Sequence, residues 1–135
     1  MIDFKKKDRY GYEDLVQIIH LLRSPGGCPW DQEQTHQSIR RNFLEETYEV
    51  LEAIDEDDPV HMCEELGDVL FAAVGASYAL GCDPEDMLHN ACEKFIGRFA
   101  RMETLAAEQG SQLDALSRQQ LLALWEKAKS DGQNA

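Results

Sequence analysis

The chain has 135 residues, which is the length of one domain. It carries 13 Lys and Arg residues against 26 Asp and Glu residues, so its formal net charge is −13 at pH 7. A surface this acidic repels nucleic acid and anionic membranes, which excludes a protein that binds polyanions without regard to sequence. Hydrophobic residues make up 43% of the chain, enough for a packed core, so the acidity does not indicate disorder.

The same features argue against a membrane or secretory location. The longest uncharged run, residues 69–82, is too short to span a bilayer and is interrupted by Ser77 and two glycines. The N-terminal residues contain three consecutive lysines and no apolar stretch, so we expect no secretory leader. The four cysteines show no Cys-x-x-Cys spacing, which is typical of reduced thiols in a cytoplasmic protein.

Apolar residues recur at helical spacing along most of the chain, and nothing indicates strands or hairpins. Residues 1–11 are highly charged, and we expect them to be frayed. Proline, glycine and capping residues mark the boundaries between the periodic segments, and residues 28–35 read as a compact loop. The pattern predicts helices over 12–23, 36–56, 59–80 and 84–108, and a short fifth helix after Ser117.

Short connections between long helices predict an all-α antiparallel bundle of four to five helices, forming a single domain over 12–129. Residues 130–135 read as a disordered tail. The helix over 59–80 is apolar almost all round after Asp68, and such a helix belongs in the middle of a bundle or at a subunit interface. We therefore expect dimerisation to complete the bundle, with residues 69–80 in the interface.

Two groups of acidic residues are difficult to explain as solvated surface. Glu45, Glu46 and Glu49 project from one sector of their predicted helix, with i,i+3 Cβ atoms about 5–6 Å apart. Like charges at this spacing destabilise a helix unless something positive lies between them. In the next helix, Glu65 and Asp68 are again three residues apart, and we expect Asp68, the last charge before the apolar run, to enter the core.

A buried unpaired carboxylate is costly, and no Lys or Arg lies between Arg41 and Lys94. The spacing therefore favours a divalent metal between the two helices, with ion pairs on a solvated surface as the alternative. An all-carboxylate site suits Mg²⁺, with Mn²⁺ as a substitute, better than structural Zn²⁺, which usually takes Cys and His.

A basic stripe follows on the next predicted helix, where Lys94, Arg98 and Arg101 stand at i, i+4 and i+7. These side chains either pair with acids of a neighbouring helix or hold phosphates above the metal. Carboxylates, Mg²⁺ and a stripe of Lys and Arg together supply what phosphoryl chemistry needs.

Three blocks of the sequence resemble the MazG-type nucleoside triphosphate pyrophosphohydrolases. The first block is Cys28-Pro29-Trp30-Asp31-x-x-Gln34-Thr35. The second is Glu45-Glu46-x-x-Glu49, followed after fifteen residues by Glu65-x-x-Asp68. The third is Lys94-Phe95-x-x-Arg98-Phe99. The acidic motif alone is weak, but three blocks in the right order at compatible distances are specific. The resemblance covers about residues 12–129.

The resemblance implies an all-α fold that forms a homodimer or a dimer of dimers. It implies Mg²⁺-dependent cleavage of a nucleoside triphosphate between the α- and β-phosphates, giving a monophosphate and pyrophosphate. By position, Glu46, Glu49, Glu65 and Asp68 would be metal ligands, and Glu45 would orient or deprotonate the attacking water. Long bacterial members carry two such domains, and this chain has room for one.

Further residues complete the expected site. Lys94 and Arg98 would hold the leaving pyrophosphate, and Trp30 would stack on the base, with Asp31 and Gln34 offering hydrogen bonds to base or sugar. The alternative for Trp30 is a loop residue that plugs the end of the bundle. The function could be house-cleaning of non-standard nucleotides, hydrolysis of dUTP, dCTP or a phosphoribosyl nucleotide by a sister all-α enzyme, or non-catalytic binding by a helical module.

Overall fold

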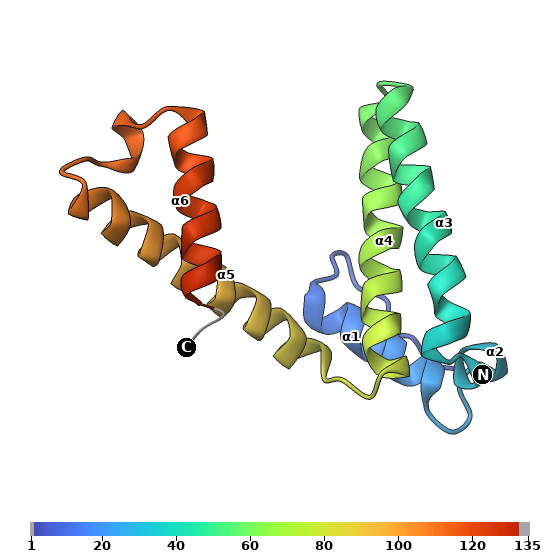
Figure 1. The fold of residues 1–135 in the computed structure, drawn as a ribbon. Helices are drawn as coiled ribbons and strands as arrows, with labels where there is room; N and C mark the ends of the chain where they lie inside the picture. The colour runs from blue at the N-terminus through green and yellow to red at the C-terminus, as the bar shows by residue number, and fades with distance from the viewer. Residues whose placement is uncertain (1, 133–135) are drawn as a thin grey trace. The chain divides into compact units, whose positions relative to one another are not determined.

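The computed structural model describes residues 2–132, and these residues form helices and no strand (Figure 1). The predicted all-α fold is confirmed. The helices are α1 (Tyr12–Arg23), α2 (Pro29–Glu33), α3 (His36–Asp55), α4 (Pro59–Ala79), α5 (Pro84–Glu108) and α6 (Arg118–Asp131), with a single 3-10 turn at Leu113–Ala115.

The ends of the helices follow the local capping chemistry. The Thr35 hydroxyl accepts a hydrogen bond from the Ser38 N–H at 3.2 Å at the start of α3. The Asp58 carboxylate accepts from the N–H groups of Val60 and His61, at 3.0 and 3.1 Å, at the start of α4. Gly81, just past the end of α4, has φ +70, a left-handed conformation in which a side chain would be strained.

The main departure from the predicted elements is α2, a helix of 5 residues in the segment expected to be a loop. Pro29 occupies its first turn, where the missing N–H of proline costs nothing. No helix precedes Tyr12 within residues 2–11. At the other end α6 extends to Asp131, past the expected domain end at 129, while residues 133–135 of the predicted tail lie outside the described residues.

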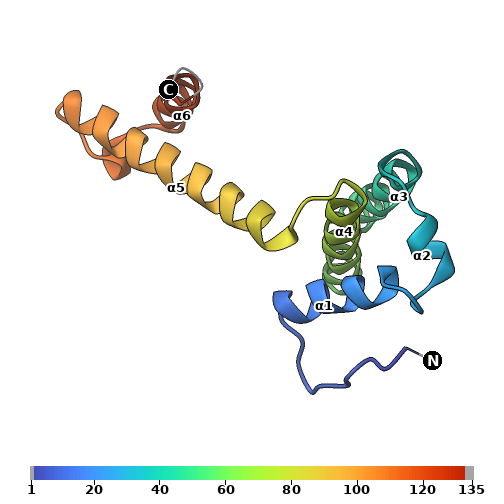
Figure 2. The same cartoon turned by 90° about the horizontal axis from the view of Figure 1, so that it is seen from below.

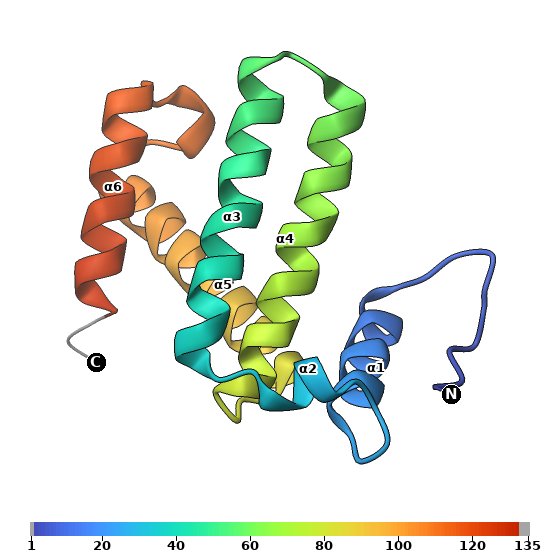
Figure 3. The same ribbon diagram turned by 90° about the vertical axis from the view of Figure 1, so that its right-hand side faces the viewer.

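The chain divides into two compact units, one up to Glu85 and one from Asp86 onward. In the first unit, α3 and α4 are antiparallel neighbours that pack along their length (Figure 3). The α1 helix contacts α4, and α2 contacts α1, near the end where α3 begins and α4 ends (Figure 2). This arrangement places the acidic segments of α3 and α4 opposite each other.

The second unit is built from α6 and the greater part of α5. Its core consists of Met102, Leu105 and Ala106 on α5 with Leu124 and Ala128 on α6. The rings of Phe95 and Trp125 extend this contact, with their centroids 5.7 Å apart.

Large apolar side chains remain exposed on the two long helices of the first unit. Leu44, Tyr48 and Ile54 on α3 are between 50% and 58% exposed, and Leu66 and Leu70 on α4 are 56% and 50% exposed. Two packed helices bury only the faces they turn toward each other, so the predicted wide apolar faces are not covered within one chain.

No single helix within residues 2–132 is long and apolar enough to cross a membrane. Only α4 and α5 taken together reach the length and apolar composition of a membrane span.

Candidate metal and nucleotide site

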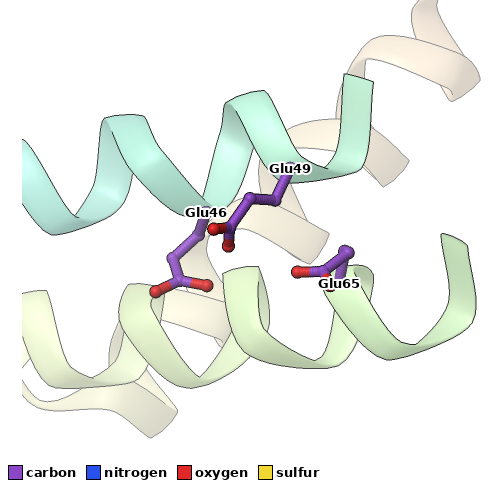
Figure 4. Close-up of side chains that lie close together, drawn as sticks. All are labelled: Glu46, Glu49 and Glu65. Atoms are coloured by element: carbon purple, nitrogen blue, oxygen red, sulfur yellow. The ribbon is translucent and has the colours of Figure 1, made fainter. Parts of the chain in front are cut away.

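Three carboxylates meet between α3 and α4 (Figure 4). Glu46 and Glu49 come from α3 and Glu65 from α4, and one oxygen of each lies within 4.8 Å of the others. The i,i+3 spacing puts the two α3 residues on one face, and the antiparallel packing of α4 brings Glu65 opposite them. The structure thus assembles three of the four side chains predicted to bind metal.

Asp68, the fourth predicted ligand, does not join this carboxylate cluster in the part of the chain described. The expectation that Asp68 enters the core is wrong, because its side chain is exposed. It lies one turn further along α4 than Glu65, where the helix faces a cavity rather than a packed interior. Its role as a metal ligand therefore stays a prediction.

The cavity beside the cluster has a volume of about 370 Å³ and lies within the first unit. Glu46 and Asp68 line it together with Trp30, Asp31 and Gln34. The three residues expected to bind the nucleoside thus share one cavity with two of the predicted metal ligands. Apolar side chains and a glycine form much of the remaining wall: Ile19, Ile39, Phe71, Ala72 and Gly75.

Two further polar residues that the sequence did not single out line this cavity. Asn42 donates from its amide to the Glu46 carboxylate at 2.8 Å. Helical spacing could have found it, because Asn42 stands four residues before Glu46. The Arg23 guanidinium donates to the backbone carbonyl of Gln34 at 3.0 Å. No sequence signal pointed to Arg23, because its place in the cavity depends on how α1 packs against the other helices.

Trp30 is 62% exposed, so within one chain its side chain is not packed into the end of the bundle. Its indole is open at the rim of the cavity. The side chain of Gln34 is already engaged: its amide donates to the Trp30 carbonyl at 3.1 Å and its oxygen accepts from the Ser38 hydroxyl at 2.7 Å. Gln34 therefore holds α2 against the start of α3.

Glu45 lies outside the cluster. Its carboxylate accepts from the Arg41 guanidinium at 2.7 Å, and the two side chains are 53% and 87% exposed. An exposed pair of this kind contributes at most about 1 kcal/mol and is easily exchanged for other contacts.

His61 contacts the cluster from the first turn of α4. Its Nε2 lies 3.0 Å from Oε1 of Glu65, and its Nδ1 lies 3.5 Å from Oε2 of Glu56. Partial burial alone would lower the pKa of His61, but the carboxylates of Glu65 and Glu56 outweigh it, so the pKa is raised.

The basic stripe lies on α5 in the second unit, and its members differ in their partners. Arg101 forms ion pairs with Asp131 at 2.8 Å and with Glu108 at 3.3 Å. Lys94 and Arg98 form no ion pair within the described residues. All three line a hollow of about 510 Å³ in that unit.

A family of known proteins matches the same part of the chain. The family described as the MazG nucleotide pyrophosphohydrolase domain matches residues 34–102, just over half of the sequence. The chain belongs to this family. The matched range includes the carboxylates of α3 and α4 as well as Lys94 and Arg98, while Trp30 and Asp31 precede it.

Several individual proteins are similar to the chain. The nucleoside triphosphate pyrophosphohydrolase/pyrophosphatase MazG of Thermotoga maritima is 46% identical over 91 residues, covering 64% of this chain and 36% of that protein. The nucleoside triphosphate pyrophosphohydrolase of Escherichia coli K12 is 35% identical over 118 residues, covering 87% of this chain and 44% of that protein. The chain therefore spans less than half the length of these relatives.

The crystal structure of a MazG-related protein from Thermotoga maritima shares the fold. It superposes with a TM-score of 0.65 at 24% identity, covering 87% of this chain and 98% of the other.

The geometry of the cluster predicts that its charges destabilise the metal-free protein. Glu49→Gln removes one of three repelling charges and should raise the free energy of unfolding without metal by about 0.5 kcal/mol, as for other like-charge pairs at helical spacing. Urea unfolding in EDTA measures this change. Glu64→Gln, next to the cluster on α4 but outside it, is the matched control and should change stability less. A destabilised Glu49→Gln protein would contradict the repulsion.

Proposed function

We propose that this chain is a Mg²⁺-dependent nucleoside triphosphate pyrophosphohydrolase that cleaves between the α- and β-phosphates, giving a nucleoside monophosphate and pyrophosphate. The observation that carries the proposal is the position of Glu46, which belongs both to the carboxylate cluster and to the lining of the neighbouring cavity. A triphosphate with its nucleoside in that cavity would have its phosphates beside the carboxylates. Membership of the MazG family and the names of the similar proteins support this activity.

The residues present fit a hard divalent cation. The cluster offers carboxylate oxygens from Glu46, Glu49 and Glu65, and within residues 2–132 no Lys or Arg forms an ion pair with them. Oxygen donors of this kind suit Mg²⁺ and Mn²⁺. We propose these three and Asp68 as the ligands. When bound, the metal would neutralise phosphate charge and acidify a coordinated water.

The chain's own residues would place the nucleotide. The exposed indole of Trp30 would stack on the base, with Asp31 and Gln34 hydrogen-bonding to base or sugar. Glu45 would orient or deprotonate the attacking water after leaving Arg41, which it contacts only in a solvent-exposed pair. Lys94 and Arg98, which carry no competing ion pair in the described part, would hold the leaving pyrophosphate.

Two other kinds of function would be distinguished by an assay of nucleotide hydrolysis. The substrate could instead be dUTP, dCTP or a phosphoribosyl nucleotide, because a base pocket built from α2 and its surroundings is not specified by the acidic motif. A non-catalytic binding module would keep the fold and turn over nothing. We place the protein in the cytoplasm, where its proposed substrates are found.

A panel of nucleoside triphosphates assayed with Mg²⁺, with pyrophosphate and orthophosphate measured separately, tests the activity. We expect pyrophosphate and not orthophosphate, and no turnover in EDTA. Glu49→Gln and Asp68→Asn should lower kcat by at least about 100-fold, since a metal supplies several kcal/mol of charge stabilisation. Glu64→Gln is the control. Orthophosphate as the first product would contradict the cleavage site, and no turnover with any substrate would favour the binding module.

Alanine variants of the basic stripe separate phosphate binding from structural pairing. Lys94→Ala and Arg98→Ala should each lower kcat/KM by about 10- to 100-fold, the value of a hydrogen bond to a charged group, with little change in melting temperature. Arg101→Ala should lose its pairs with Asp131 and Glu108, lower stability by no more than about 1 kcal/mol, and keep activity. Full activity in both of the first two variants would remove Lys94 and Arg98 from the site.

We also propose that two chains form a homodimer, alone or within a dimer of dimers. The exposed apolar side chains of α3 and α4 are the reason, since a contiguous apolar face on a stable protein is normally covered. Light scattering at micromolar concentration should give a dimer or tetramer. Leu70→Glu, in the expected interface, should shift the mass toward monomer, and Gln119→Glu, at an exposed position of α6 outside these two helices, should not. A strictly monomeric wild type would contradict the proposal.

A further inference from the structure

His61 connects the turn between α3 and α4 to the carboxylate cluster. It occupies the first turn of α4, where its backbone N–H is fixed by the capping carboxylate of Asp58 at 3.1 Å. From there its ring reaches one turn along the helix to Glu65, at 3.0 Å, and back to Glu56, at 3.5 Å. The ring is therefore held between the turn on one side and the cluster on the other.

Glu65 is the least exposed of the three side chains that meet at His61. Its side chain is only 12% exposed, against 39% for His61 and 65% for Glu56. Within residues 2–132, His61 is the only basic side chain within ion-pair distance of Glu65. A mostly buried carboxylate beside two others would otherwise turn away from them, because like charges repel at this spacing.

We propose that His61 is a positioning residue for metal binding: it donates from Nε2 to Oε1 of Glu65 and so holds the other oxygen toward Glu46 and Glu49. The proposal rests on the metal site of the proposed function. It adds a residue that lies outside the acidic motif and does not line the cavity beside the cluster.

Two physical effects of His61 predict opposite results, which makes the proposal testable. If the ring acted only through positive charge, it would repel a metal ion, and neutral substitutes would bind metal more tightly. If it acts by orienting Glu65, loss of the hydrogen bond should weaken binding by about 10- to 100-fold, as for other residues that orient metal ligands.

The experiment compares His61→Gln with His61→Ala, which are both neutral but differ in whether the side chain can donate. The Gln amide can donate to a carboxylate one turn away on a helix, as the Asn42 amide does to Glu46 at 2.8 Å, whereas the Ala side chain cannot. Mn²⁺ affinity is measured by titration, without substrate, following free Mn²⁺ by electron paramagnetic resonance. The control is His89→Ala, which removes an exposed histidine of α5.

We expect His61→Ala to weaken Mn²⁺ binding about 10-fold or more, His61→Gln to retain most of the affinity, and His89→Ala to match the wild type. Unchanged or tighter binding by His61→Ala, or equal loss in both His61 variants, would overturn the proposal. Failure of the wild type to bind Mn²⁺ would instead reject the metal site of the proposed function, so the two failures are distinguishable.

A measurement on the wild-type protein keeps the test independent of how the variants fold. Long-range ¹H–¹⁵N spectra report which ring nitrogen of each histidine carries a proton. We expect His61 to be protonated at Nε2, and Mg²⁺ to shift its ring resonances while those of His89 stay fixed. A His61 ring that does not respond to Mg²⁺, in a protein that binds the ion, would overturn its contact with a metal ligand.

Discussion

The mutual repulsion of carboxylates brought together by helix packing is the constraint around which the first unit is organised. Glu46, Glu49 and Glu65 are drawn within 4.8 Å of one another because α3 and α4 pack side by side, not because the acids attract. The apolar contacts between the helices must outweigh that repulsion in the metal-free chain. In a site built in this way, a bound divalent cation would relieve the repulsion, and metal affinity would then be coupled to folding.

Two polar contacts orient carboxylates of the cluster. Asn42 donates to Glu46, and Nε2 of His61 lies 3.0 Å from Oε1 of Glu65, so one carboxylate on each helix has a neighbouring polar partner. Both partners lie four residues before the acid they contact, which is the spacing at which helical side chains meet. Local helix geometry thus orients the acids, while the packing of the two helices determines how close they come.

The second organising feature is the cavity that α1 and α2 close beside α4. Its polar groups come from α1, α3 and α4 as well as from α2, and its apolar wall comes mainly from α1, α3 and α4, a combination typical of small-molecule sites. Glu46 lies in both the cavity and the cluster, so any ligand that fills the cavity is placed beside the acids. The short helix α2 matters here because it presents Trp30 at the rim instead of burying it.

The sequence by itself determined every helix except α2, because proline, glycine and capping residues act within a few positions along the chain. Thr35, Asp58 and Ser117 cap α3, α4 and α6 from the position just before each helix. Helical spacing likewise determined which acids share a face. Tertiary structure alone decided that Glu46, Glu49 and Glu65 converge while Asp68 turns to an open cavity, since that depends on how α3 and α4 are packed. Tertiary structure also decided that Arg23 lines the cavity, because α1 reaches the cavity only through its packing against other helices, which the local sequence does not indicate.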